Sequence, residues 1–219
     1  MQVVVIRHGI TPNNVEGRFG GRLDNPLTEE AREDIRELVK SHPYPEVERI
    51  YRSPAIRCEE TVRLSFPGYQ GETEEVEDLW ELSFGDYENV SMDVIWKDPA
   101  MSRAWREKPA DFAFPGGEVF GECIERGIRC IRRILGDARG RGLETIAIVS
   151  HGFLLSEALP RLTEGQGEGA LPLLLPNGRG LLFETTENAD TPLRYLETLP
   201  RGVEFPDISD SPYVRPAEE

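Results

Sequence analysis

Two of the three histidines in this 219-residue chain lie just beyond short apolar runs. Arg7 separates His8 from the run at 3–6, and Ser150 separates His151 from the run at 146–149. Apolar runs of this length are typical of strands buried on both faces of a sheet. One histidine at a strand end is more often structural, whereas two at equivalent positions favour a functional site. In open α/β sheets, ligands bind at the carboxyl ends of the strands, so both imidazoles are predicted to face a ligand.

Two arginines and one glutamate complete a set of polar residues that can do chemistry: Arg7, Arg57 and Glu81. Histidine and glutamate can ligate a metal ion, but arginines repel a dication, and the chain has no HxH or HExxH spacing. Guanidinium groups instead match the geometry of a tetrahedral oxyanion such as phosphate. The sequence therefore predicts a phosphate site that needs neither a metal ion nor a cofactor.

This set of residues predicts phosphoryl transfer. A neutral imidazole can attack phosphorus and form a covalent phosphohistidine. The remaining cations would offset the charge that builds on the transferring oxygens. Glu81 could protonate the leaving oxygen and later accept a proton from water.

The elements that must position these residues alternate between strand and helix patterns, which indicates an α/β fold. Strands are predicted at residues 3–6, 49–52, 74–77, 146–149, 181–185 and 193–198. Helices are predicted from Thr28 to before Pro43, from Ser53-Pro54 onward, over 120–140 and over 153–162. Thr28 and Ser53 are expected to be N-caps, with Pro54 at the first helical position. A long polar, glycine-rich loop over 9–26 is expected to be functional.

The aromatic segment at 80–114 is interpreted as an insertion or lid on a single α/β domain. One or two short helices are expected over 91–114. Trp96 and Trp105 are expected to form the small core of this lid, with stacking on a substrate ring as the alternative. The last twenty residues contain several prolines and acids and predict an extended or mobile tail.

The chain is acidic, with a formal net charge of −15 at pH 7. This charge argues against nucleic acid or an anionic membrane as a partner, although a local basic pocket can still bind a small phosphate ester. Three cysteines without a CxxC pair indicate a reduced, cytoplasmic protein. No signal peptide and no transmembrane helix are predicted. A monomer or a homodimer is expected.

The polar residues fall into motifs that run in order along the chain. The motifs are Arg7-His8-Gly9-x-Thr11, Ser53-Pro54-x-x-Arg57-x-x-x-Thr61, Glu81-x-x-Phe84-Gly85-x-Tyr87-Glu88 and Ser150-His151-Gly152. They resemble the motifs of the histidine phosphatase superfamily, also called the phosphoglycerate mutase-like family. The resemblance implies a three-layer α/β/α sandwich with a mostly parallel central sheet and a small helical lid. It implies a single domain over 1–199 with the lid at about 83–116, followed by the tail at 200–219.

The same resemblance assigns roles to individual residues. It implies that His8 is the phosphorylated nucleophile and that Glu81 is the proton donor. The groups that hold the phosphoryl are then Arg7, Arg57 and His151. The residues expected to bind substrate are Thr11, Asn14, Arg18, Gly20 and Gly152, although a loop arginine such as Arg18 is as often solvated or paired.

Within the superfamily, the chain resembles the small bacterial phosphatases, alpha-ribazole phosphatase among them. Four positions depart from the usual motifs: Ile10, Tyr87, Asn89 and Phe153. Of these, Ile10 and Phe153 are expected at the edge of the pocket. The predicted activity is a metal-independent phosphomonoesterase acting on a small phosphorylated metabolite. The alternatives are a bisphosphoglycerate-dependent phosphoglycerate mutase and an inactive phosphate-binding relative. The retained Glu81 argues against the inactive relative, because binding alone needs no proton donor.

Overall fold

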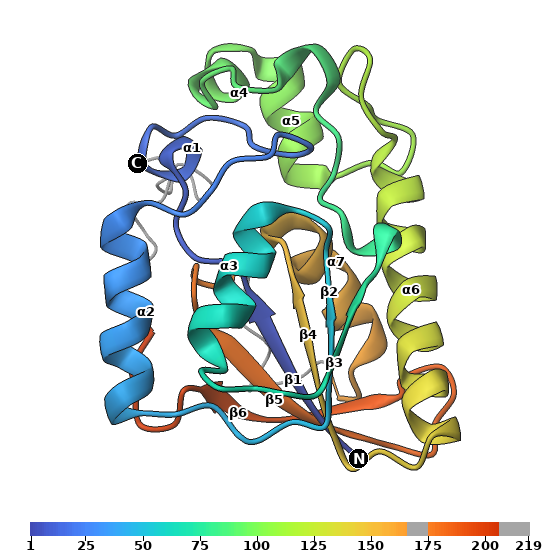
Figure 1. Cartoon of the computed structure of the whole chain (residues 1–219). Coiled ribbons are helices and arrows are strands. Elements are labelled where there is room, and N and C mark those ends of the chain that lie inside the picture. The colour runs from blue at the N-terminus through green and yellow to red at the C-terminus, as the bar shows by residue number, and fades with distance from the viewer. Residues whose placement is uncertain (166–174, 206–219) are drawn as a thin grey trace.

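The computed structural model describes residues 1–165 and 175–205, and Figure 1 shows one central sheet with helices on both faces. Its six strands lie in the order β3-β2-β4-β1-β5-β6. They span Gln2–Arg7 (β1), Arg49–Arg52 (β2), Glu72–Glu75 (β3), Thr145–Ser150 (β4), Gly180–Thr185 (β5) and Leu193–Leu199 (β6). The first four are mutually parallel, whereas β5 runs antiparallel to β1 and to β6. The predicted mostly parallel α/β sheet is therefore confirmed. Most of the predicted tail, residues 206–219, lies outside the described residues.

Alternate residues of the central strand β1 enter two separate cores, one on each face of the sheet. Val4 and Ile6 pack under α2 (Glu29–Ser41) and α3 (Ile56–Ser65). Val3 and Val5 pack under α6 (Phe120–Gly140) and α7 (Gly152–Leu162). This arrangement is the expected three-layer sandwich (Figure 1).

The starts of two helices test the predicted N-caps. Thr28 caps α2 as predicted, since its hydroxyl accepts a hydrogen bond from the Ala31 N–H at 3.1 Å. The predictions for Ser53 and Pro54 are wrong: α3 begins at Ile56, and the Asp24 carboxylate accepts from the Ile56 N–H at 2.9 Å. The Ser53 hydroxyl accepts only a long bond of 3.4 Å from the Ala55 N–H, and its 2.7 Å partner is His151. The third strand also begins two residues earlier than the predicted 74–77.

The predicted lid segment forms α4 (Asp93–Lys97) and α5 (Pro99–Glu107), which lie beyond the carboxyl ends of the parallel strands (Figure 1). The polypeptide that leads to them carries only two short 3-10 turns, Glu77–Leu79 and Gly85–Tyr87. The glycine-rich loop after β1 contains one further short helix, α1 (Pro12–Val15), that the sequence did not predict.

All three cysteines are buried and form no disulfide. Over residues 1–165 and 175–205, none of the helices combines the length and the apolar character needed to cross a bilayer.

Candidate active site

His8 and His151 leave two neighbouring parallel strands at the same level. Arg7 of β1 lies opposite Ser150 of β4, so the next residue of each strand is a histidine. Their ring centroids are 5.2 Å apart in an edge-to-face arrangement, and both side chains are buried. The strand register therefore brings together the two histidines that the sequence singled out.

The ring of His8 is held in one tautomer. Its Nδ1 lies 2.7 Å from the carbonyl oxygen of Gly9. Because a carbonyl can only accept, Nδ1 carries the hydrogen, and Nε2 of the neutral ring keeps its lone pair. Burial, followed by the charges of Arg57 and Arg7, lowers the pKa of His8 well below its usual value. The imidazole is thus neutral, with an unprotonated nitrogen.

His151 adopts the opposite tautomer. Two guanidinium nitrogens of Arg57 lie 3.0 and 3.2 Å from its Nδ1, and a guanidinium can only donate. Its Nε2 therefore carries the hydrogen and donates to the Ser53 hydroxyl at 2.7 Å. Burial and the Arg57 charge lower the pKa of His151 well below its usual value. Both of its ring nitrogens are engaged within the protein.

Arg57 also ties the loop after β1 to the site. Its guanidinium donates to the carbonyl oxygens of Gly20, Gly21 and Leu23, at 3.1, 2.7 and 2.6 Å. The side chain is almost fully buried. Arg57 thus supplies a positive charge behind His8 and fixes the course of the loop.

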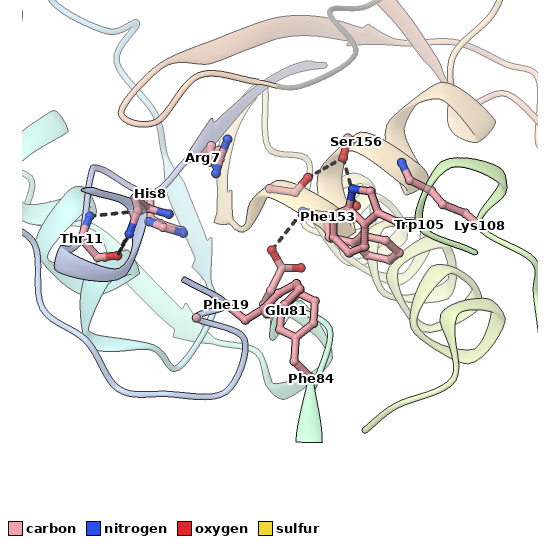
Figure 2. A pocket seen from close by; sticks show the side chains of 13 residues that line it. Arg7, His8, Thr11, Phe19, Glu81, Phe84, Trp105, Lys108, Phe153 and Ser156 are labelled. Carbon is pink, nitrogen blue, oxygen red and sulfur yellow. Dashed lines mark hydrogen bonds between the residues drawn. The ribbon is translucent and has the colours of Figure 1, made fainter. Parts of the chain in front are cut away.

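A cavity of about 200 Å³ opens beside His8. Figure 2 shows Arg7 and His8 on one side of it, Trp105, Phe153 and Lys108 on the other, and Glu81 between them. The predicted site residues that line it are Arg7, His8, Thr11, Asn14, Gly20, Glu81 and Gly152. Arg57 and His151 are not among its lining residues: His151 packs against the ring of His8, and Arg57 bonds to His151.

Arg18 does not reach this cavity, although it was a predicted substrate-binding residue. Its Nε pairs with the Glu16 carboxylate at 2.7 Å, and its Nη1 donates to the carbonyl of Asn89 at 2.8 Å. The side chain is more than one-third exposed. The alternative that the sequence left open, a paired loop arginine, is what the structure has.

Arg7 lies flat against the start of α7. A Cβ added to Gly152 would stand 2.9 Å from the Arg7 Cζ and 3.0 Å from its Nε, closer than real side chains approach. The other end of the guanidinium donates from Nη1 to the Leu175 carbonyl at 2.8 Å. Glycine at position 152 is therefore what allows the guanidinium to sit at the cavity wall.

Glu81 accepts hydrogen bonds from three backbone N–H groups. Its Oε2 accepts from Phe153 at 2.9 Å, and its Oε1 accepts from Leu154 and Leu82, both at 3.0 Å. Two of these donors belong to the first turn of α7, where N–H groups have no partner within the helix. The N-terminus of α7 thus orients the carboxylate at the cavity wall.

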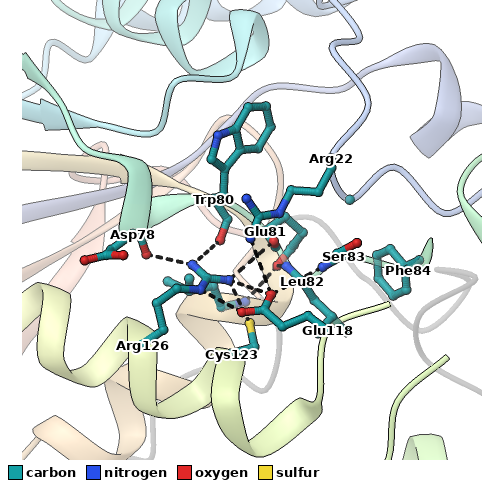
Figure 3. A network of polar contacts seen from close by, with 12 residues as sticks. Arg22, Asp78, Trp80, Glu81, Leu82, Ser83, Phe84, Glu118, Cys123 and Arg126 are labelled. Carbon is teal, nitrogen blue, oxygen red and sulfur yellow. Dashed lines mark hydrogen bonds and ion pairs between the residues drawn. The ribbon is translucent and has the colours of Figure 1, made fainter. Parts of the chain in front are cut away.

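A partly buried ion pair holds the irregular segment that carries Glu81 (Figure 3). Arg126 of α6 donates to the carbonyl oxygens of Asp78 and Trp80, at 2.7 and 2.8 Å, and forms two 2.8 Å bonds with the Glu118 carboxylate. The Glu118 N–H donates to the Ser83 carbonyl at 3.0 Å. Burial opposes ionisation of Glu118, but Arg126 outweighs it and lowers the pKa of that carboxyl. Arg126 and Glu118 therefore clamp both sides of Glu81.

The structure adds several cavity residues that the sequence reasoning missed. They are Phe19, Phe84, Lys108 and Ser156. Trp105 is buried in the core on the α6–α7 face of the sheet rather than in a separate lid core, and it also lines the cavity, whereas Trp96 packs against that core. Phe153 lines the cavity as its position after the fourth motif suggested, but Ile10 does not.

The sequence reasoning also missed Asn177, which donates to the His8 carbonyl at 3.0 Å. Its place in a Pro-Asn-Gly turn was the one sequence feature that could have drawn attention to it.

In the part of the chain that the structure describes, no three His, Cys, Asp or Glu side chains are grouped so that they could hold a metal ion.

Comparison with known proteins finds relatives of this chain by sequence and by structure. A putative phosphoserine phosphatase 2 of Hydrogenobacter thermophilus is 29% identical over 202 residues, covering 90% of this chain and 96% of that protein. The adenosylcobalamin/alpha-ribazole phosphatase of Escherichia coli is 26% identical over 205 residues, covering 93% and 99%. The crystal structure of the alpha-ribazole phosphatase from Shigella flexneri superimposes with a TM-score of 0.74 at 25% identity, covering 94% of this chain and all of that one. Residues 3–197 match the histidine phosphatase superfamily (branch 1), and the chain belongs to that family.

Proposed function

We propose that this protein is a phosphomonoesterase that hydrolyses a small phosphorylated metabolite through a phosphohistidine, without a metal ion. The observation that carries the proposal is the state of His8. Its ring is neutral, its Nδ1–H is bound to the Gly9 carbonyl, and it lines a cavity beside Arg7 and Glu81. This arrangement gives Nε2 the lone pair that an attack on phosphorus needs.

In the first step, His8 Nε2 forms a bond to phosphorus and the bond to the ester oxygen breaks. The Gly9 carbonyl accepts from Nδ1–H and so stabilises the positive charge that the ring gains. Arg7 at the cavity wall and Arg57 behind His8 offset the charge on the phosphoryl oxygens. Glu81 delivers a proton to the departing alkoxide.

In the second step, a water oxygen bonds to phosphorus and the bond to Nε2 breaks. Glu81 takes the proton from that water, which returns the carboxyl to the form it needs for the next cycle. His151 keeps Arg57 in place through Nδ1, and it contacts the phosphoryl group only if its Nε2–H exchanges Ser53 for a phosphoryl oxygen.

Release of inorganic phosphate from purified protein tests the proposal. We expect turnover of p-nitrophenyl phosphate and of at least one member of a panel of phosphorylated metabolites. A coupled assay with phosphoglycerates separates this activity from the mutase alternative, which would isomerise phosphoglycerate faster than it releases phosphate. No phosphate release from any ester would point to an inactive phosphate-binding relative instead.

Chelation of metal ions is expected to leave the rate nearly unchanged, because Arg7 and Arg57 supply the positive field that a metal ion would otherwise provide. The measurement is steady-state turnover before and after dialysis against EDTA. Vanadate and inorganic phosphate should inhibit, as oxyanions that fit the same donors. A large loss with EDTA that Mg²⁺ or Zn²⁺ restores would contradict the metal-independent mechanism.

Replacing Arg126 by alanine is expected to lower kcat by about 10- to 100-fold, because the segment that positions Glu81 loses its clamp. The loss should be larger for alkyl esters than for p-nitrophenyl phosphate, since only the alkyl esters need the Glu81 proton. Arg133→Ala is the matched control: Arg133 is on the same helix and binds the same segment through the Asp78 side chain, at the surface. Equal losses for both ester classes would show a general structural effect rather than misplacement of Glu81.

A further inference from the structure

Four aromatic side chains form one continuous wall of the cavity. We call Phe19, Phe84, Trp105 and Phe153 the aromatic wall; all four line the cavity and are less than one-tenth exposed. Phe19 and Phe84 have centroids 4.4 Å apart, and Trp105 lies 6.0 Å from Phe19 and 6.0 Å from Phe153. They come from the loop after α1, the segment after Glu81, α5 and α7, respectively. A surface assembled from four separate elements presents ring faces and edges to whatever group occupies the cavity.

The cavity offers little to a substrate that carries a carboxylate away from the phosphate. Among its lining residues, the only cation apart from Arg7 is Lys108. The Lys108 ammonium forms an ion pair with the buried carboxylate of Glu157 and lies 5.6 Å from the centroid of the Phe153 ring. A carboxylate bound at Lys108 would have to displace Glu157 or lie close to it. Lys108 is thus already paired within the protein, with a carboxylate that also binds Arg161 at 3.0 Å.

The backbone at Lys108 supports the same interpretation. This residue ends α5 in the left-handed region, with φ of 45°, where glycine is the usual residue. From there its ammonium lies over the Phe153 ring, at the distance of a cation–π contact. Lys108 therefore acts as part of the wall that encloses an apolar group.

The size of the cavity sets a limit on that group. An apolar cavity of about 150 Å³ is enough to hold a benzene molecule. The cavity here is about 200 Å³. It therefore has room for a phosphoryl group at His8 and one flat ring against the aromatic wall (Figure 2).

We infer that this site prefers phosphate monoesters whose alcohol carries a flat apolar ring close to the ester oxygen, over monoesters whose alcohol carries a carboxylate. This inference rests on the proposed function, because it places the phosphoryl group at His8. The ring binds against the aromatic wall, and the specificity-determining residues are Trp105 and Phe153.

The first test compares kcat/KM for benzyl phosphate, ethyl phosphate and phosphoglycolate. All three are esters of simple alkyl alcohols, so they depend on proton donation in a similar way and differ mainly in the group beside the ester oxygen. We expect benzyl phosphate to exceed both of the others by about 10- to 100-fold, the gain from burying one ring. Phosphoglycolate turned over as well as or better than benzyl phosphate would overturn the inference.

The second test uses variants of the wall. Trp105→Leu and Phe153→Leu should lower kcat/KM for benzyl phosphate at least fivefold more than for ethyl phosphate. Phe112→Leu is the matched control, because Phe112 packs in the same aromatic cluster, 4.9 Å from Phe120, but does not line the cavity. Its benzyl-to-ethyl ratio should stay as in the wild type. An unchanged ratio in both wall variants, or an equal change in the control, would contradict the assigned role.

The third test asks whether Lys108 binds a carboxylate of the substrate. It also separates the preference for a ring from the proposed phosphatase function. Lys108→Met should leave the preference for benzyl phosphate over phosphoglycolate unchanged. If the wild type instead preferred phosphoglycolate and Lys108→Met lost that preference, Lys108 would be shown to bind a carboxylate. Calorimetric binding of benzylphosphonate and phosphonoacetate, which cannot be hydrolysed, measures recognition without turnover. Tighter binding of benzylphosphonate without hydrolysis of any ester would overturn the proposed function but support the preference for a ring. Equal binding of the two phosphonates by an active enzyme would overturn only the preference.

Discussion

Replacing His8 by alanine is expected to reduce phosphate release by about 10⁴-fold or more, as removal of a covalent nucleophile does in other enzymes. The loss should appear with both good and poor leaving groups, because every ester must pass through the same bond to Nε2. Wild-type protein quenched during turnover should carry an acid-labile phosphate that the variant lacks. A variant that keeps near wild-type activity would rule out the phosphohistidine.

The fold should survive this substitution, since His8 lies at the end of β1 and its side chain makes one hydrogen bond, to the neighbouring Gly9. Circular dichroism and the thermal unfolding midpoint measure this. His42→Ala is the matched control, because His42 only follows the last turn of α2. Its activity should be that of the wild type.

The state of His8 also sets the expected pH dependence of the first step. Burial and the two arginines lower the pKa of His8, so the ring stays neutral as the pH falls through about 6.5, the value for a free histidine. The burst of phosphoenzyme formation should therefore persist below that pH. Loss of the burst with an apparent pKa near 6.5 would mean that His8 is titrating normally.

Replacing Glu81 by glutamine is expected to slow esters of poor leaving groups by about 10²–10⁴-fold, the usual contribution of a general acid. Glutamine retains one oxygen for the N–H groups of α7 but cannot transfer a proton. Benzyl phosphate and p-nitrophenyl phosphate suit the comparison, because both carry one ring but only benzyl alcoholate needs a proton as it leaves. Phosphorylation by p-nitrophenyl phosphate should suffer much less.

Pre-steady-state burst measurements isolate this step from hydrolysis of the phosphoenzyme. Glu88→Gln is the control, since Glu88 lies in the same segment and also accepts backbone hydrogen bonds, from Arg22 and Phe84. Equal losses of the phosphorylation rate for both esters in Glu81→Gln would mean that Glu81 is structural and that the proton comes from Glu88 or water.

The sequence predicted those parts of the fold that depend on neighbouring residues. The apolar runs that became β1 and β4, and the Thr28 cap, are local patterns, and all three are confirmed. Ser53 shows the limit of such reasoning: its type and its place before Pro54 are typical of an N-cap, but His151, which follows the neighbouring strand β4, is the nearer partner at 2.7 Å. Tertiary contacts decided between two uses of the same hydroxyl.

The candidate site could likewise be predicted from the sequence only in part. The two histidines could be paired from sequence because adjacent parallel strands end at a common edge. The cavity wall could not be predicted, because Lys108 and Ser156 both line the cavity but come from the end of α5 and from α7, and neither lies in a recognisable motif. Arg18 was singled out by its place in the loop that follows the first motif, yet the nearby Glu16 carboxylate pairs with it at the surface.

The position of β1 in the sheet has a consequence for the order of folding. β1 is the first strand of the chain, but its two neighbours are β4 and β5, and Gln2 pairs with Thr145 and Glu184. Ribosomes add about 5–20 residues per second, so on the order of 10 s pass before β1 can find its first neighbour. Until then, an apolar strand with both edges unpaired must remain in the nascent chain, and the site cannot form. Contacts this distant along the chain also favour slow folding.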